Sequence, residues 1–276
     1  MNAILAIAQT EIRIGIRNRW VVLSTLILLV FALLLVLLGS APTGATKADS
    51  LSVMVASLST LSVYLVPLIA LLLSFDAIAG EIDRGTLQLT FASPVSRGQV
   101  LIGKFLGHVF VLGIAVLSGY GIAGAVAYWT GQNTGVAGVS DLARLIMTSI
   151  ALGATFITIG YVASASVRQT GTAAALAVAI WLFSVVLYDL ALLGGLLASS
   201  DGLFAKTLFP YLLVANPADA FRVFNMAGIG LAEAATGLAA NGSAMPFSPH
   251  LAIISPFIWM GLGLVASTVI LKRIQP

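Results

Sequence analysis

Six long apolar runs, separated by polar stretches, dominate the pattern of this chain. They cover residues 20–39, 51–75, 105–129, 142–167, 172–197 and 250–271. Each run reaches or exceeds the roughly 20 residues that an α-helix needs to cross the hydrocarbon core of a bilayer. We therefore expect an all-α polytopic membrane protein with six transmembrane helices, forming a single transmembrane domain over residues 1–276.

The stretch before the first run, residues 1–19, is expected to form a helix of its own. Apolar residues recur on one helical stripe and polar residues on the next: Ile4, Ala8, Ile12 and Ile16 against Gln9, Arg13 and Arg17. This pattern is typical of an amphipathic helix that lies in the membrane interface. The alternative is an ordinary basic flank of the first span. A cleavable signal peptide is not expected, because the first apolar run is too long.

The window between the second and third runs, residues 76–104, is the most charged part of the chain. Its charged side chains include Glu81, Asp83, Arg84, Arg97 and Lys104. Because such side chains prefer water to lipid, we expect an aqueous loop between two crossings. Gly85 and Pro94 interrupt it, so it cannot be one continuous helix. Leu87 and Phe91, four residues apart, favour a short helix, although their alternating pattern leaves a short strand as the alternative.

The longest segment outside the apolar runs is residues 198–249. Within it, Asn216, Pro217 and Asp219 form a typical helix start: a capping side chain, a proline in the first turn and an acidic residue near the positive end of the helix dipole. We predict a helix from residue 217 to about residue 235. The whole segment is expected to form short amphipathic helices on the outer surface.

Composition strengthens the membrane assignment and narrows the function. Hydrophobic residues make up 59% of the chain and charged residues 8%, against about 25% charged residues in a soluble domain. The mean hydropathy is +1.08. Cysteine is absent, which excludes disulfides and thiolate metal ligands. The net charge of +3 is too small to indicate a nucleic-acid partner, so the basic residues report membrane topology instead.

The basic residues are distributed unequally between the two sides of the membrane. One side would carry nine of them: Arg13, Arg17, Arg19, Arg84, Arg97, Lys104, Arg168, Lys272 and Arg273. The other side would carry four, which are Lys47, Arg144, Lys206 and Arg222. Because cytoplasmic loops are enriched in Lys and Arg, the first side is predicted to be cytoplasmic. Both termini and the window 76–104 would then face the cytoplasm of a bacterial cell, and residues 198–249 would lie outside its inner membrane.

Candidate catalytic and metal-binding motifs are weak. Gly98, Gly103 and Lys104 have the spacing of a nucleotide-binding loop, but Phe105 follows where a hydroxyl residue is needed for magnesium, so this chain is not expected to hydrolyse ATP. Asp189 lies inside the fifth run and raises the possibility of an intramembrane aspartyl protease. The Gly-x-Gly-Asp sequence of such enzymes is missing, so we interpret Asp189 as a packing residue that faces the bundle interior. No paired Met or His motif points to a metal site.

The window 76–104 resembles the cytoplasmic loop of the ABC transporter permeases of the second exporter class, which are type V exporter-like. Glu81, Gly85-Thr86, Pro94-Val95-Ser96-Arg97 and Lys104, flanked by spans two and three, carry the resemblance. It implies a coupling helix at residues 86–93 that docks on a separate ATPase subunit, where ATP and magnesium bind, and a homodimer of this chain. The implied coupling residues are Glu81, Arg84, Gly85, Thr86, Leu87, Phe91, Pro94, Arg97 and Lys104, with Arg168 as a second contact.

In length and order of segments, the whole chain is also similar to the permeases of NosDFY-type complexes, which mature the copper centres of nitrous oxide reductase. This resemblance implies a NosF-like ATPase and a NosD-like periplasmic partner. The expected contacts for that partner are Phe209, Tyr211, Asn216, Asp219 and Arg222. Copper or a sulfur species would be the cargo, unless the complex only remodels its partner. The alternatives are the permease of an unrelated small-molecule or drug exporter, and a passive membrane anchor for an extracytoplasmic protein.

Overall fold

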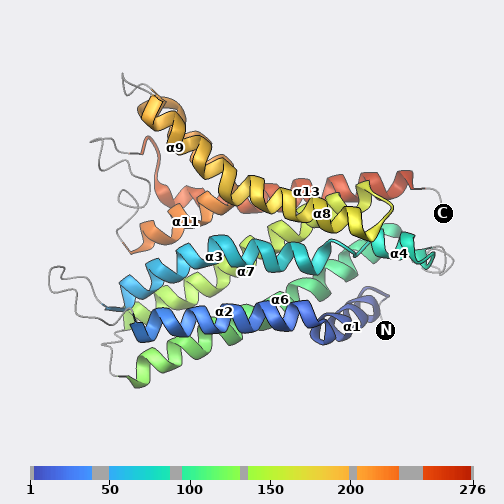
Figure 1. Cartoon of the computed structure of the whole chain (residues 1–276), viewed down its shortest axis with the longest axis horizontal. Coiled ribbons are helices and arrows are strands. Elements are labelled where there is room, and N and C mark those ends of the chain that lie inside the picture. Colours follow the sequence, from blue (N-terminus) through green and yellow to red (C-terminus); the bar gives the residue numbers. More distant parts are fainter. Residues whose placement is uncertain are drawn as a thin grey trace.

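The fold is a bundle of helices. The computed structural model describes residues 3–38, 50–87, 95–130, 136–198, 204–229 and 245–274, and every element within these ranges is a helix. Six helical segments in the described ranges are long and apolar enough to cross a membrane. They run side by side along the long axis of the molecule (Figure 1). The predicted all-α fold with six transmembrane helices is therefore confirmed.

The helices of the six spans follow the apolar runs closely. The first four spans are the helices α2 (Arg19–Leu38), α3 (Ser50–Ser74), α6 (Arg97–Trp129) and α7 (Val136–Ser166). The fifth span consists of α8 (Thr170–Trp181), η1 (Leu182–Leu187) and α9 (Tyr188–Ala198). The sixth span is α13 (Ile254–Arg273), which follows the short 3-10 helix η4 (Pro249–Ile253). In the fifth span, η1 is a π-helical segment, which gives that span a change of winding at its middle.

The third span begins earlier than the sequence pattern indicated. Ser96 caps α6: its hydroxyl accepts from the backbone N–H of Gln99 at 3.2 Å, and the Gln99 side chain accepts from the N–H of Ser96 at 2.9 Å. This capping box starts the helix at Arg97, so residues 97–104 are helical and continuous with the third span instead of forming a loop. The expectation that Lys104 is a loop residue is therefore wrong.

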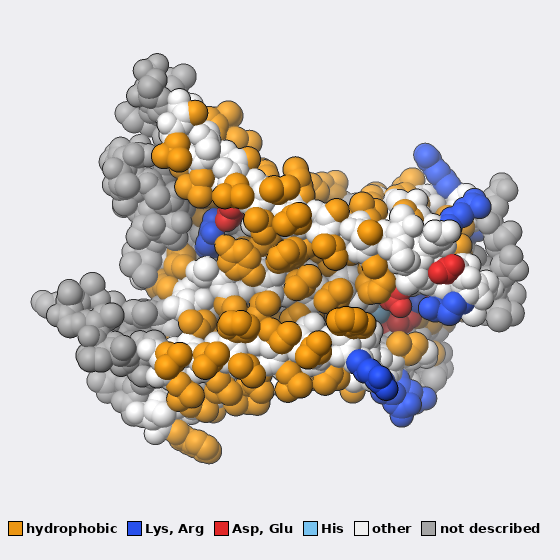
Figure 2. Space-filling model, viewed as in Figure 1, with side chains coloured by type: hydrophobic (Ala, Val, Ile, Leu, Met, Phe, Trp, Pro, Cys, Tyr) orange, Lys and Arg blue, Asp and Glu red, His pale blue; other side chains and the backbone are white. Residues whose placement is uncertain are grey.

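Helix α7 lies at the centre of the bundle, where it packs against α3, α6 and α13. Small residues allow these close approaches. A Cβ added to Gly160 would meet the Ser74 side chain of α3, and one added to Gly263 of α13 would meet Thr158. Close packing through small residues is a common way for helices to associate in a membrane, where burial of apolar surface drives little. By contrast, only a small share of α2, of the α8–α9 span and of the last span is buried. Figure 2 shows apolar side chains covering the middle of the face in view.

The predicted N-terminal helix is present as α1 (Ala3–Arg17), and its buried side follows only part of the expected apolar stripe. Ala8 of that stripe is buried, but so are Glu11 and Gly15, whereas Ile16 is 49% exposed. The buried side is shifted because α1 packs against α6. Built on Gly107, a Cβ would lie only 2.6 Å from the Cβ of Glu11, so the glycine lets α1 approach α6 closely at this acidic residue.

The segment after the fifth span also differs from its prediction. It forms η2 (Phe204–Leu208), α10 (Phe209–Ala215) and α11 (Pro217–Gly228). Asn216 caps α11 as predicted, accepting from the N–H of Ala218 at 3.0 Å. The helix ends at Gly228 rather than near residue 235, and residues 230–244 lie outside the described ranges. Helix α11 does not rest on the surface: it packs against α3 and α7 and buries Phe221 completely, because one of its faces is apolar enough to join the core.

Replacing Gly107 by valine should destabilise the protein by about 1–3 kcal/mol, because the added side chain overpacks the contact between α1 and α6. Gly121 of the same helix has open space around its Cβ position, so Gly121→Val is the matched control. Thermal unfolding of both variants in detergent measures the difference. Equal unfolding midpoints for the two variants would contradict the close packing of α1.

Candidate coupling site

One end of the bundle holds α1, the short helix α4 (Ala79–Asp83) and the C-terminal end of α13, and we call this end the base (Figure 1). The nine basic residues that were assigned to one side lie on α1, at the starts of α2 and α6, directly after α4, in the turn between α7 and α8, and at the end of α13. Figure 2 shows Lys and Arg side chains gathered there, beyond the apolar belt. The other end, which holds α10 and α11, is called the far end.

Helix α4 has only five residues, yet both of its ends are tied to neighbouring helices. At its N-terminal end, the backbone N–H groups of Ile78 and Ala79 donate to the Ser164 hydroxyl of α7 at 3.0 and 2.9 Å. At its C-terminal end, the Asp83 carboxylate accepts from the N–H and the hydroxyl of Thr170, the first residue of α8, at 3.2 and 2.9 Å. These bonds satisfy free N–H groups at the starts of two helices and hold α4 on α7 and α8.

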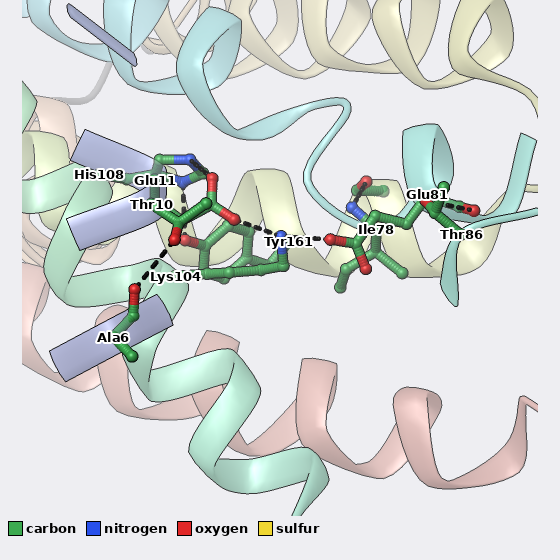
Figure 3. Close-up of polar contacts among 10 residues, drawn as sticks. Ala6, Thr10, Glu11, Ile78, Glu81, Thr86, Lys104, His108 and Tyr161 are labelled. Atoms are coloured by element: carbon green, nitrogen blue, oxygen red, sulfur yellow. Dashed lines mark hydrogen bonds and ion pairs between the residues drawn. The ribbon is translucent and has the colours of Figure 1, made fainter. Parts of the chain in front are cut away.

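A buried charge cluster connects α4 with α1 and α6. The Lys104 ammonium lies 2.5 Å from Oε1 of Glu11 and 2.7 Å from Oε1 of Glu81 (Figure 3). The exposed fractions of the three side chains are 6%, 11% and 18%, so water screens these charges only weakly. The cluster explains why a lysine is tolerated inside a helix that spans the membrane: two carboxylates replace its hydration.

The cluster extends to α7 through a histidine. The second carboxylate oxygen of Glu11 lies 3.3 Å from Nε2 of His108, and Nδ1 of His108 lies 2.8 Å from the Tyr161 hydroxyl. Burial raises the pKa of Glu11, but the hydrogen bond to His108 and the charge of Lys104 outweigh it and lower that pKa to about 2. Glu11 is therefore charged at neutral pH. One chain of polar contacts thus joins α4, α1, α6 and α7.

The predicted coupling residues fall into two groups. Arg84, Gly85, Thr86 and Arg168 are exposed at the base, and Gly85 makes the turn after α4 with a positive φ of 69°. The others make internal contacts or lie outside the described ranges. Lys104 and Glu81 belong to the cluster, Leu87 is 5% exposed, and Arg97 donates to the carbonyls of Leu271 and Ile274 at the end of α13. Phe91, Pro94 and most of the predicted coupling helix at 86–93 are outside the described residues.

A second ionic cluster lies toward the far end. Arg222 of α11 contacts Asp189 of α9 at 3.2 Å and Asp219 of its own helix at 2.6 Å. Burial, together with the nearby Asp189, raises the pKa of Asp219 even though Arg222 opposes this. The proximity of Asp189 and Asp219 was not predicted, since Asp219 was assigned to a surface helix. Phe209, Asn216 and Asp219 are buried, so among the predicted partner contacts Tyr211, at 58% exposure, is the open side chain.

The fold and the base together define a class: a membrane protein built as a bundle of six spans, with charged side chains gathered at one end. The chain matches the family described as ABC-2 family transporter protein over residues 5–273, and it belongs to that family. A relative from Stutzerimonas stutzeri, "Probable ABC transporter permease protein NosY", is 38% identical over 275 residues, which cover 99% of each chain. A protein of the same name from Pseudomonas aeruginosa is 36% identical over 267 residues, covering 96% of this chain and 94% of the relative. The protein is therefore the permease subunit of an ABC transporter, a multi-pass membrane subunit that works with an ATPase.

Replacing Lys104 by methionine should cost about 3–5 kcal/mol of stability, because it leaves two buried carboxylates without a counter-charge. Adding Glu11→Gln and Glu81→Gln to that variant should recover a large part of the loss. Unfolding by denaturant in detergent measures both, and Arg17→Met, which removes an exposed charge of α1, is the control. If Lys104→Met costs no more than this control, the cluster does not hold the base together.

Proposed function

We propose that this permease couples ATP hydrolysis in its ATPase subunit to motion of the bundle, as a homodimer with two ATPase copies. The base would face the cytoplasm of a bacterial cell, inside the inner membrane, and the far end would face the periplasm. The gathering of basic side chains at the base supports this orientation, since Lys and Arg are enriched in cytoplasmic loops. Both termini would then be cytoplasmic. No cofactor is needed in this chain, because ATP and magnesium would bind to the ATPase.

The observation that carries the proposal is the cluster of Glu81, Lys104 and Glu11. The loop at 84–97, which contains the predicted coupling helix, is attached at one end to α4 and at the other to α6. Because Lys104 ties α4 to α6 and α1, the two ends of the loop belong to one unit. Separating this buried ion pair would cost several kcal/mol, so we expect a push on the loop to move the three helices together.

We further propose that the complex is of the NosDFY type and serves the maturation of the copper centres of nitrous oxide reductase. The similarity to the two NosY relatives over nearly the whole chain supports this. The ATPase would be NosF-like and the periplasmic partner NosD-like. Within the described residues there is no group of three His, Cys, Asp or Glu side chains that could hold a metal. If copper is handled, the partner is expected to supply the ligands.

In the proposed cycle, ATP binding closes the two ATPase subunits and draws the two bases together. The bundles then rock, and the far end, with α10 and α11, transmits the motion to the periplasmic partner. Tyr211 on α10 is the exposed residue that we expect at that contact. In one version of the cycle the cargo is copper or a sulfur species; in a second version no solute moves and the cycle only remodels the partner.

The orientation can be tested directly, because the chain has no cysteine. Lys272→Cys at the base and Ser248→Cys at the far end each introduce one exposed thiol. A membrane-impermeant maleimide should label Ser248→Cys in spheroplasts and Lys272→Cys only after the membrane is opened. Labelling of Lys272→Cys in sealed spheroplasts would overturn the orientation.

The coupling role needs a readout that does not depend on the cargo. Spin labels on Ser248→Cys in the two copies of the dimer should report a change of distance at the far end when ATP binds to the ATPase subunits. Adding Lys104→Met should suppress this change while the ATPase stays bound, since the loop is no longer tied to the bundle. Arg17→Met should leave the change intact. A full distance change in the Lys104→Met complex would show that the cluster does not transmit the motion.

A further inference from the structure

A pocket at the base lies beside the predicted coupling loop, and it has no role in the contacts between helices that are described above. Its volume is about 430 Å³, and it opens between the turn after α4, the turn between α7 and α8, and the end of α13. Its apolar wall includes Ile82, Ala165 and Ile270, and the exposed side chains of Arg168 and Arg273 also line it. Among the described residues that line it, none is acidic.

We infer that this pocket receives a side chain of the ATPase subunit: a large apolar group flanked by a carboxylate. The ATPase partner follows from the family, and the position of the pocket at the base rests on the proposed orientation and coupling role. An apolar wall beside two guanidinium groups fits such a pair, because the apolar group loses water inside the pocket and the carboxylate can accept from an arginine.

The location of the pocket determines which helices the ATPase subunit would contact. A group inserted there touches α4, the α7–α8 turn and α13 at once. Arg97 already fixes the end of α13 to the start of α6 through the carbonyls of Leu271 and Ile274. The ATPase would therefore contact the end of the sixth span as well as the coupling loop.

Charge reversal and filling of the pocket test this inference in two independent ways. The combined change Arg168→Glu and Arg273→Glu should weaken binding of the ATPase subunit to the permease in nanodiscs by at least about tenfold. Ser166→Trp, at an exposed position in the pocket lining, should weaken it similarly by filling the space. Lys272→Glu changes the neighbouring exposed charge, which does not line the pocket, and should bind within about twofold of the unaltered chain.

The outcomes separate this inference from the coupling proposal. If neither the double arginine change nor Ser166→Trp weakens binding of the ATPase subunit, the proposed pocket contact is wrong. Equal weakening by Lys272→Glu would overturn it too, since it would show a general effect of charge. Neither result changes the outcome expected in the spin-label measurement with Lys104→Met, which tests the coupling role separately.

Discussion

The arrangement of the base depends on one ammonium group buried between two carboxylates. Lys104 of the third span is held by Glu11 from the N-terminal helix and by Glu81 from the helix after the second span. A charge in this position is stable only while all of its partners are present, because each charge left alone would face a poorly solvating interior. The requirement fixes three helices relative to one another, and through His108 and Tyr161 it extends to the central helix α7.

The far end repeats this arrangement with different residues. There, one guanidinium, that of Arg222, lies between the carboxylates of Asp189 and Asp219 and joins the outer half of the fifth span to α11. Two further hydrogen bonds support the joint: Tyr188 donates to the Leu212 carbonyl at 2.6 Å, and Asn216 donates to the Ser184 carbonyl at 2.6 Å. The π-helical segment η1 lies next to these contacts, and such segments often mark places where a helix changes course. Both ends of the bundle are thus tied by ions, with an apolar middle between them.

These ion pairs suit the permease subunit of an ABC transporter, which works with a separate ATPase. In the proposed cycle, work enters at the base and appears at the far end, and a bundle can transmit it only if its helices move as units. Glycines such as Gly160 of α7, against Ser74 at the end of α3, bring neighbouring helices into close contact. The exposed apolar faces of α2, α8 and α13 leave the outside free to lie against lipid or a second copy.

The sequence by itself determined the six spans, the cap of α11 at Asn216 and the family, because hydrophobic length and local capping patterns are encoded in neighbouring residues. It could not show that Lys104 is buried, since its partner Glu11 lies 93 positions away. It misassigned α11 to the surface for the same reason: the groove between α3 and α7 exists only in the folded bundle. Which charges are exposed and which are paired inside was decided by tertiary structure alone, because burial depends on contacts between segments that are remote in the chain.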